Sequence, residues 1–189
     1  MPDIAAVHTN IPVESNEPGL TSLAGVVGRV AHAIDRILSP GDVAELRHLA
    51  PSDPFAPAFF KLMASIVDPD QKLSAEGRTR DIIEHRWASF FQAAATMRGM
   101  HNPARKLGNA LASAGYTELR LVRLLRARDN TLFKEIRTCA HFLAAKAQTC
   151  DLTDLAHLLL VTNTEQAESI RRTVARAYYH LQTQEKKEN

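Results

Sequence analysis

Residues 107–129 read LGNALASAGYTELRLVRLLRARD, and this stretch decides the fold. Apolar residues recur at helical spacing on both sides of Gly115, which predicts helices over 103–114 and 117–128. Gly115 suits the left-handed position that follows a helix, and Thr117 suits the cap of the next one. The stretch therefore predicts two consecutive helices joined by a tight glycine turn.

The second of these helices carries four arginines and no lysine between residues 116 and 129. At 100° per residue, Leu121, Val122, Leu124 and Leu125 fall within about 160° of one another. Arg120, Arg123 and Arg126 are centred on the opposite side, at spacing i, i+3, i+6. Arg128 falls back toward the apolar side at the end of the helix, where its charge favours the dipole.

Helical periodicity continues through most of the remaining chain, and no segment alternates as a strand does. Asp42 is expected to cap a short helix over VAELRHLA, with Glu45 three residues on. The polar segment 67–80 is expected to be a loop. Further helices are predicted over 21–38, 59–66, 81–99, 130–147, 151–161 and 164–182. The fold class is therefore all-α: a single compact bundle of about eight helices, in which short junctions favour antiparallel neighbours.

The chain is expected to divide into a flexible N-terminal arm (1–19), one helical domain (20–182) and a disordered tail (183–189). It contains no apolar run of 18 residues, so no membrane span is predicted. The N-terminus lacks the basic start and apolar run of a signal peptide, and a cytoplasmic protein is expected. Cys139 and Cys150 lack CxxC spacing and are interpreted as packed thiols.

The motifs of common catalytic and cofactor sites are missing. None of the eight histidines has another His or Cys at the i+3 or i+4 spacing of a helical ligand pair. No GxSxG, Walker A or GxGxxG sequence occurs. We therefore predict no enzyme, no cofactor and no metal.

Basic charge is concentrated in the second half of the chain. Residues 1–100 hold 9 Lys+Arg and 12 Asp+Glu, a net charge of −3, whereas residues 101–182 hold 12 and 7, a net charge of +5. Arg120 and Arg123 have no carboxylate at i±3 or i±4, whereas Arg126 has Asp129. Arginine also suits forked contacts with phosphate. The basic residues expected to join Arg120, Arg123, Arg126 and Arg128 in binding a nucleic-acid backbone are Arg105, Lys106, Lys134, Arg137, Arg171 and Arg172.

Two other interpretations stay open from the residues alone. A helix, a glycine turn and a second helix also describe a helix-turn-helix regulator, with 117–128 as its recognition helix. Alternatively, the arginines of a helical interaction module could bind an acidic protein. A solvated charged face is the simplest reading of such a run.

The residues of 107–151 resemble the signature region of the CasB family, the small subunit of the type I-E CRISPR surveillance complex Cascade. The matching positions are Leu107, Gly108, Ala110 to Ala112, Gly115, Arg120, Leu124 to Ala127, Arg137 and Asp151. Two outer segments agree as well: GDVAELRHL, which contains Arg47, and IRRTVARAYY. The register of elements matches from about residue 22 to residue 180.

The resemblance implies a non-catalytic, all-helical subunit that is present in two copies beside other Cascade subunits and the guide RNA. Its basic surfaces would steady the target strand and hold the displaced non-target strand of the R-loop. Arg47 then joins the residues expected to bind nucleic acid.

Overall fold

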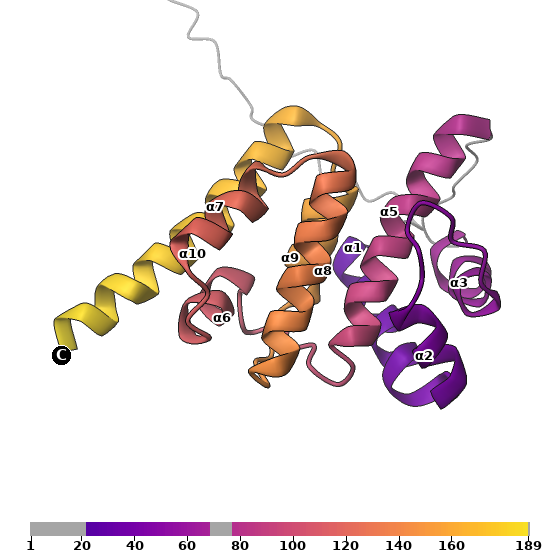
Figure 1. Cartoon of the computed structure of the whole chain (residues 1–189), viewed down its shortest axis with the longest axis horizontal. Coiled ribbons are helices and arrows are strands. Elements are labelled where there is room, and N and C mark those ends of the chain that lie inside the picture. The colour runs from indigo at the N-terminus through magenta and orange to yellow at the C-terminus, as the bar shows by residue number, and fades with distance from the viewer. Residues whose placement is uncertain (1–21, 69–76, 189) are drawn as a thin grey trace, which may run out of the picture.

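The computed structural model describes residues 22–68 and 77–188 of the 189-residue chain. Figure 1 shows these residues as a compact helical body, from which one end of the last helix projects. The flexible arm expected over residues 1–19 lies outside the described residues. Residues 69–76 of the expected loop over 67–80 lie outside them as well.

The described residues form nine α-helices and two single π-helical turns, and they contain no strand. The prediction of an all-α fold is therefore confirmed. In chain order the elements are α1 (Leu23–His32), η1 (Ala33–Ile37), α2 (Pro40–Arg47), α3 (Pro57–Leu62), η2 (Met63–Val67), α5 (Gly77–Thr96), α6 (Leu107–Ser113), α7 (Glu118–Arg126), α8 (Asp129–Ala145), α9 (Leu152–Leu160) and α10 (Thr164–Glu188).

The cap of α2 differs from the prediction by three residues. Ser39, not Asp42, is the N-cap, and its hydroxyl accepts a hydrogen bond from the Asp42 amide at 3.1 Å. The Asp42 carboxylate accepts in return from the Ser39 amide at 3.2 Å, which completes a capping box. Glu45 instead accepts from the Ala58 amide at 2.9 Å and so holds the start of α3 against α2.

Helix ends also differ from the predicted ones. Segment 103–106 precedes α6 as a turn, because the Asn102 side chain accepts from the Ala104 amide. Gly115 has φ +74°, as its predicted left-handed role requires. Thr117 occupies the N-cap of α7 but makes no capping bond with its side chain. α5 begins at Gly77 rather than at 81, and α10 continues past 182 to Glu188.

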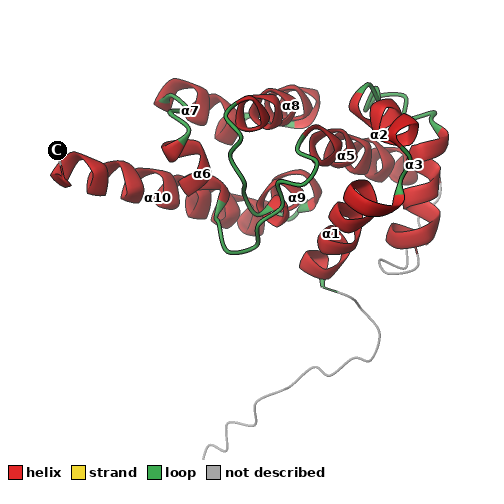
Figure 2. Ribbon diagram, turned by 90° about the horizontal axis from the view of Figure 1, so that it is seen from below, coloured by secondary structure: helices red, strands yellow, loops and turns green. Residues whose placement is uncertain are grey.

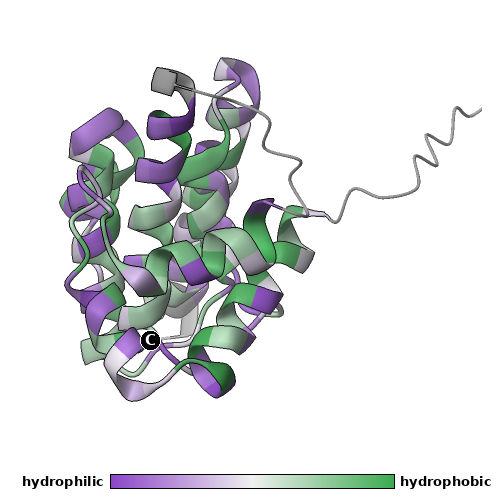
Figure 3. Cartoon of the chain, turned by 90° about the vertical axis from the view of Figure 1, so that its right-hand side faces the viewer, coloured by the Kyte–Doolittle hydropathy of each residue, from purple (hydrophilic) through white to green (hydrophobic). Residues whose placement is uncertain are grey.

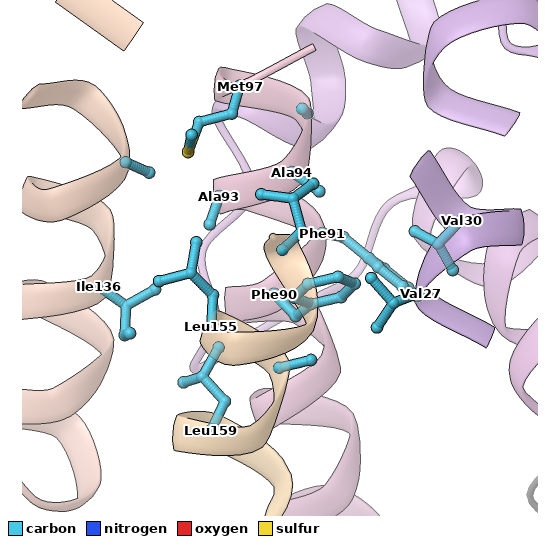
Figure 4. Close-up of a cluster of buried hydrophobic side chains, with 14 of the residues drawn as sticks. Val27, Val30, Phe90, Phe91, Ala93, Ala94, Met97, Ile136, Leu155 and Leu159 are labelled. Carbon is cyan, nitrogen blue, oxygen red and sulfur yellow. The ribbon is translucent and has the colours of Figure 1, made fainter. Parts of the chain in front are cut away.

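The core is built around α5. Trp87, Phe90 and Phe91 are buried on this helix, and their rings pack against one another with centroids 5.6–6.2 Å apart. Figure 4 shows Phe90 and Phe91 beside apolar side chains that three other helices contribute. These side chains are Val27 and Val30 of α1, Ile136 of α8, and Leu155 and Leu159 of α9. Trp87, the single tryptophan of the chain, therefore lies in the core.

The arrangement in Figures 1 and 2 has α2 and α3 at one end, α6, α7 and α10 at the other, and α1, α5, α8 and α9 between them. Hydrophilic and hydrophobic residues alternate in bands along the helices in Figure 3, as amphipathic helices around one core require. Among the described residues, no helix combines the length and the apolar composition needed to cross a lipid bilayer.

Candidate nucleic-acid interface

α7 divides into an apolar side and a basic side, as its sequence predicts. Leu121 and Leu124 are fully buried, whereas Arg120, Arg123 and Arg126 are exposed. The apolar side packs against α8, and this contact fixes the direction of the arginines. The helix therefore presents three guanidinium groups on its outer side, at the predicted spacing.

Arg123 is nevertheless not free. Its guanidinium donates to the Glu135 carboxylate on α8 at 2.7 Å. The Glu135 side chain is only 10% exposed, whereas that of Arg123 is 64% exposed. The expectation that Arg123 lacks an acidic partner was wrong, because the partner comes from the next helix and not from its own. Much of the Arg123 charge is thus neutralised before any ligand arrives.

Arg120 has an aromatic rather than an acidic neighbour. Its guanidinium carbon lies 5.6 Å from the centre of the Phe142 ring on α8. A cation over an aromatic face is held in place without losing its charge. Within the described part of the chain no ion pair involves Arg120, so this arginine can meet a phosphate.

Arg126 and Arg128 have different roles. α7 ends at Arg126, and Asp129 begins α8 with φ +45°, so the expected i+3 relation on one helix does not exist. No ion pair of Arg126 occurs among the described residues. Arg128 donates through Nη1 to the carbonyls of Leu125, Arg126 and Ala127 at 2.9–3.2 Å. The predicted interaction of Arg128 with the C-terminal end of the helix is confirmed.

Lys134 and Arg137 line a groove of about 400 Å³ between α8 and the segment that follows α2. Both are exposed, and neither forms an ion pair within the described ranges. Phe133 and Asn130 lie in the same groove, opposite His48. The groove thus combines two cations with an aromatic surface and an amide, the side-chain types that contact single-stranded nucleic acid.

Arg47 lies at the end of α2, next to His48. Its Nε donates to the Ala95 carbonyl of α5 at 3.0 Å, which holds the stem of the side chain against α5. The residue is nonetheless exposed. Because His48 lines the groove of Lys134 and Arg137, Arg47 lies next to that groove.

Lys106 lines a larger open groove of about 890 Å³ between α6 and α10. Arg176 and His180 of α10 line the same groove, and neither was predicted as a site residue. Arg172, Arg176 and His180 are spaced i, i+4, i+8 on one helix, and this spacing can be found in the sequence alone. Arg105 lies beside the groove residue Lys106, half-buried, and its carbonyl accepts from the Asp151 amide at 2.7 Å.

Arg171 and Arg172 are adjacent but differ in environment. Arg172 is exposed and lies 3.5 Å from the Glu168 carboxylate. Arg171 points into a cavity that Arg86 and Arg128 also line. Burial, and then the nearby Arg128 charge, lower the pKa of Arg171 below its ordinary value. The structure thus brings Arg128 and Arg171 together and adds Arg86, which sequence reasoning did not identify.

No metal centre is visible in the described ranges, where no three His, Cys, Asp or Glu side chains gather as a ligand set. His101 instead has a structural role, because its Nδ1 accepts from the Leu152 amide at 3.2 Å. Asp154 accepts from the Leu107 amide at 2.8 Å, and so links α9 to the start of α6. Both contacts hold helix ends in place.

Fold and site together define an all-helical protein whose described residues carry several separate basic surfaces. The family model for the CRISPR-associated protein Cse2 matches residues 42–179. The chain therefore belongs to the Cse2 family of CRISPR-associated proteins.

Solved structures agree on the fold. CasB from Thermobifida fusca superposes with a TM-score of 0.64 at 17% identity, covering 85% of this chain and 99% of that one. CasB from M. ruber gives a TM-score of 0.57 at 20% identity, covering 88% and 97%. A search of curated protein sequences finds no match.

Proposed function

We propose that this protein is a non-catalytic small subunit of a type I-E Cascade complex, which steadies the target strand and holds the displaced strand of the R-loop through contacts with the phosphate backbone. Family membership supports the association with a CRISPR effector. The observation that carries the strand-binding role is the set of exposed cations that lack acidic partners within the described residues: Arg120 and Arg126 of α7, and Lys134 and Arg137 of α8.

The physical reason concerns the balance of the R-loop. Forming the RNA–DNA heteroduplex gains about as much free energy as losing the DNA duplex costs. A modest electrostatic contribution on the displaced strand can then decide whether the open state persists. Backbone contacts do not read sequence, which suits a subunit that must accept any target.

The guide RNA, the other Cascade subunits and a second copy of this chain are the proposed partners. The basic surfaces lie on several sides of α7, α8 and α10, so strand contacts and subunit contacts can use different faces. Co-expression with the guide RNA and neighbouring subunits, followed by sizing, tests whether two copies enter the complex. A complex that forms without this chain bound would contradict the proposal.

The strand-binding role is tested by charge reversal within the assembled complex. Arg120→Glu with Arg126→Glu should shorten the R-loop lifetime while assembly stays intact. Arg36→Glu, on the exposed side of η1, makes one reversal of the same kind away from α7 and should leave the lifetime unchanged. Arg123 is unsuitable for this test because its reversal would face the buried Glu135. R-loops as long-lived in the doubly reversed complex as in wild type would refute the role.

The other two interpretations give different results with the isolated protein. A helix-turn-helix regulator would select one operator sequence and discriminate against others by several orders of magnitude. A module for an acidic protein would co-purify with one partner and no nucleic acid. The proposed function instead requires similar affinity for unrelated single strands.

A further inference from the structure

A small cavity of about 240 Å³ lies where the junction of α7 and α8, the end of α9 and the first turns of α10 meet. Three arginines from three different parts of the chain line it: Arg86 of α5, Arg128 between α7 and α8, and Arg171 of α10. Like charges repel, so three guanidinium groups around one cavity need a compensating feature.

The protein's own hydrogen bonds use only part of these three guanidinium groups. Arg86 donates through Nη1 to the Leu159 carbonyl. Arg128 donates through Nη1 to the three carbonyls at the end of α7. The Nε of Arg171 is buried and has no hydrogen-bond partner among the described residues. A buried donor without a partner destabilises the fold, and more so when it is charged.

Two carboxylates belong to the same cavity lining, those of Asp129 and Glu168. Their two negative charges are fewer than the three positive charges of the arginines. Glu168 in addition lies 3.5 Å from the guanidinium of Arg172, outside the lining. Burial, and then the positive charge of Arg128 nearby, lower the pKa of Arg171. An excess of positive charge therefore remains at the cavity.

We propose that this cavity binds one phosphate group, held by Arg86, Arg128 and Arg171. A tetrahedral oxyanion offers acceptors in several directions, which suits guanidinium groups that come from three elements. Its negative charge would relieve the repulsion between Arg128 and Arg171. The inference rests on the proposed function only for the source of the phosphate, which can be free in solution or part of a nucleic-acid backbone.

The test is calorimetric titration of the full chain with inorganic phosphate at constant ionic strength, balanced with chloride. Wild type should bind one phosphate saturably, and Arg171→Gln should weaken binding at least about tenfold, because one charged hydrogen bond and one charge are lost. Arg36→Gln is the matched control: it makes the same change on η1, outside this cavity, and should bind as wild type does.

A second variant keeps the proposal testable if Arg171→Gln fails to fold. Glu168→Gln removes one negative charge from the cavity lining and should strengthen phosphate binding. No saturable binding to wild type, or equal affinity of wild type, Arg171→Gln and Glu168→Gln, would overturn the proposal.

The source of the phosphate is distinguished with a single-stranded oligodeoxythymidine. If the strand supplies the phosphate, Arg171→Gln weakens binding of both probes and inorganic phosphate competes with the strand. If free phosphate is the ligand, only phosphate binding weakens. Both results support the cavity as a phosphate site. The test is separate from that of the proposed function, because charge reversal of Arg120 and Arg126 should leave phosphate binding unchanged.

Discussion

The Arg123–Glu135 pair joins α7 to α8 with one buried and one exposed partner. If the pair is broken, water can solvate the exposed Arg123 guanidinium. Little water can reach the buried Glu135 carboxylate. Glu135 therefore depends on the pair much more than Arg123 does. Position 123 consequently contributes to stability more than to the charge available for a ligand.

Arg123→Gln should lower the free energy of unfolding by about 1 kcal/mol, because it leaves the buried Glu135 carboxylate without its charged partner. The estimate is at the low end because the pair is open to water on the arginine side. Arg126→Gln removes an equally placed arginine that has no ion pair in the described residues, and should change stability by less than about 0.5 kcal/mol. Urea unfolding of both variants checks this, and equal losses would contradict it.

The two buried thiols make stability sensitive to alkaline pH. Burial raises the pKa of Cys139 from its ordinary value of 9.0 to about 12 and also raises that of Cys150. Above pH 9 the unfolded chain releases these protons while the folded chain retains them. Stability is therefore complete below pH 9 and falls as pH rises toward 12, by up to about 1.4 kcal/mol per pH unit for each thiol.

Urea unfolding between pH 8 and pH 11 measures this loss. The double variant Cys139→Ala/Cys150→Ala should show a shallower decline than wild type. Some decline should remain, because the pKa of Tyr116 is also raised by burial. Identical slopes for wild type and variant would show that the thiols do not cause the pH dependence.

At the scale of elements, the close packing of α6 against α10 depends on a glycine. A Cβ atom on Gly108 of α6 would lie 2.2 Å from the Val174 carbonyl oxygen and 2.8 Å from the Tyr178 amide nitrogen, both in α10. These are backbone atoms, which cannot move aside without shifting the helix. Tyr178 also donates its hydroxyl to the Tyr116 carbonyl, so α10 contacts both α6 and the segment between α6 and α7.

Gly108→Ala should therefore force α6 and α10 apart and destabilise the fold by about 1–3 kcal/mol or more. Gly28→Ala is the matched control, since a Cβ at Gly28 of α1 meets no atom within 4 Å. It should stabilise α1 by about 0.5–1 kcal/mol, because alanine is the better helix former. Thermal melts of the two variants should move in opposite directions, and a Gly108→Ala melt at or above that of wild type would contradict the packing argument.

The elements that periodicity predicts are those whose determinants are local. The apolar side of α7, the glycine turn at Gly115 and the buried Trp87 follow from spacing within one segment. The cap of α2 was misplaced because Ser39 and Asp42 both belong to the capping box, and the sequence does not show which one begins the helix.

Contacts between distant segments explain the remaining differences. Glu135 reaches Arg123 from the next helix, beyond the i±4 range that sequence spacing examines. Arg86 meets Arg128 and Arg171 only because α5, α8 and α10 converge. The role of Gly108 depends on Val174, far along the chain. Each of these is a property of helix packing, which no single segment encodes.

At the scale of the whole molecule, the cations are concentrated in the second half of the chain. Within the described residues, 22–68 and 77–100 hold 8 Lys+Arg and 7 Asp+Glu, whereas 101–182 hold 12 and 7, and α7, α8 and α10 carry eight of these 12 cations. The cations are distributed over several grooves and not gathered in one site. A long, flexible polyanion can contact several such surfaces at once, whereas a small ligand cannot.

Binding of a single-stranded oligonucleotide should therefore weaken steeply as salt rises, since each neutralised phosphate contributes about 0.7 to the slope of log affinity against log salt concentration. Lys134→Gln with Arg137→Gln should reduce the slope by about 1.4, because two exposed cations leave the groove on α8. Arg36→Gln removes an arginine of the N-terminal half that already pairs with Asp35, and should leave the slope unchanged. Fluorescence anisotropy measures the slope for all three proteins between 50 mM and 300 mM salt, a range over which the Debye length falls by roughly half.

Equal slopes for the double variant and wild type would mean that strands do not use the α8 groove. The proposed function would then depend on Arg120, Arg126 and the α6–α10 groove alone.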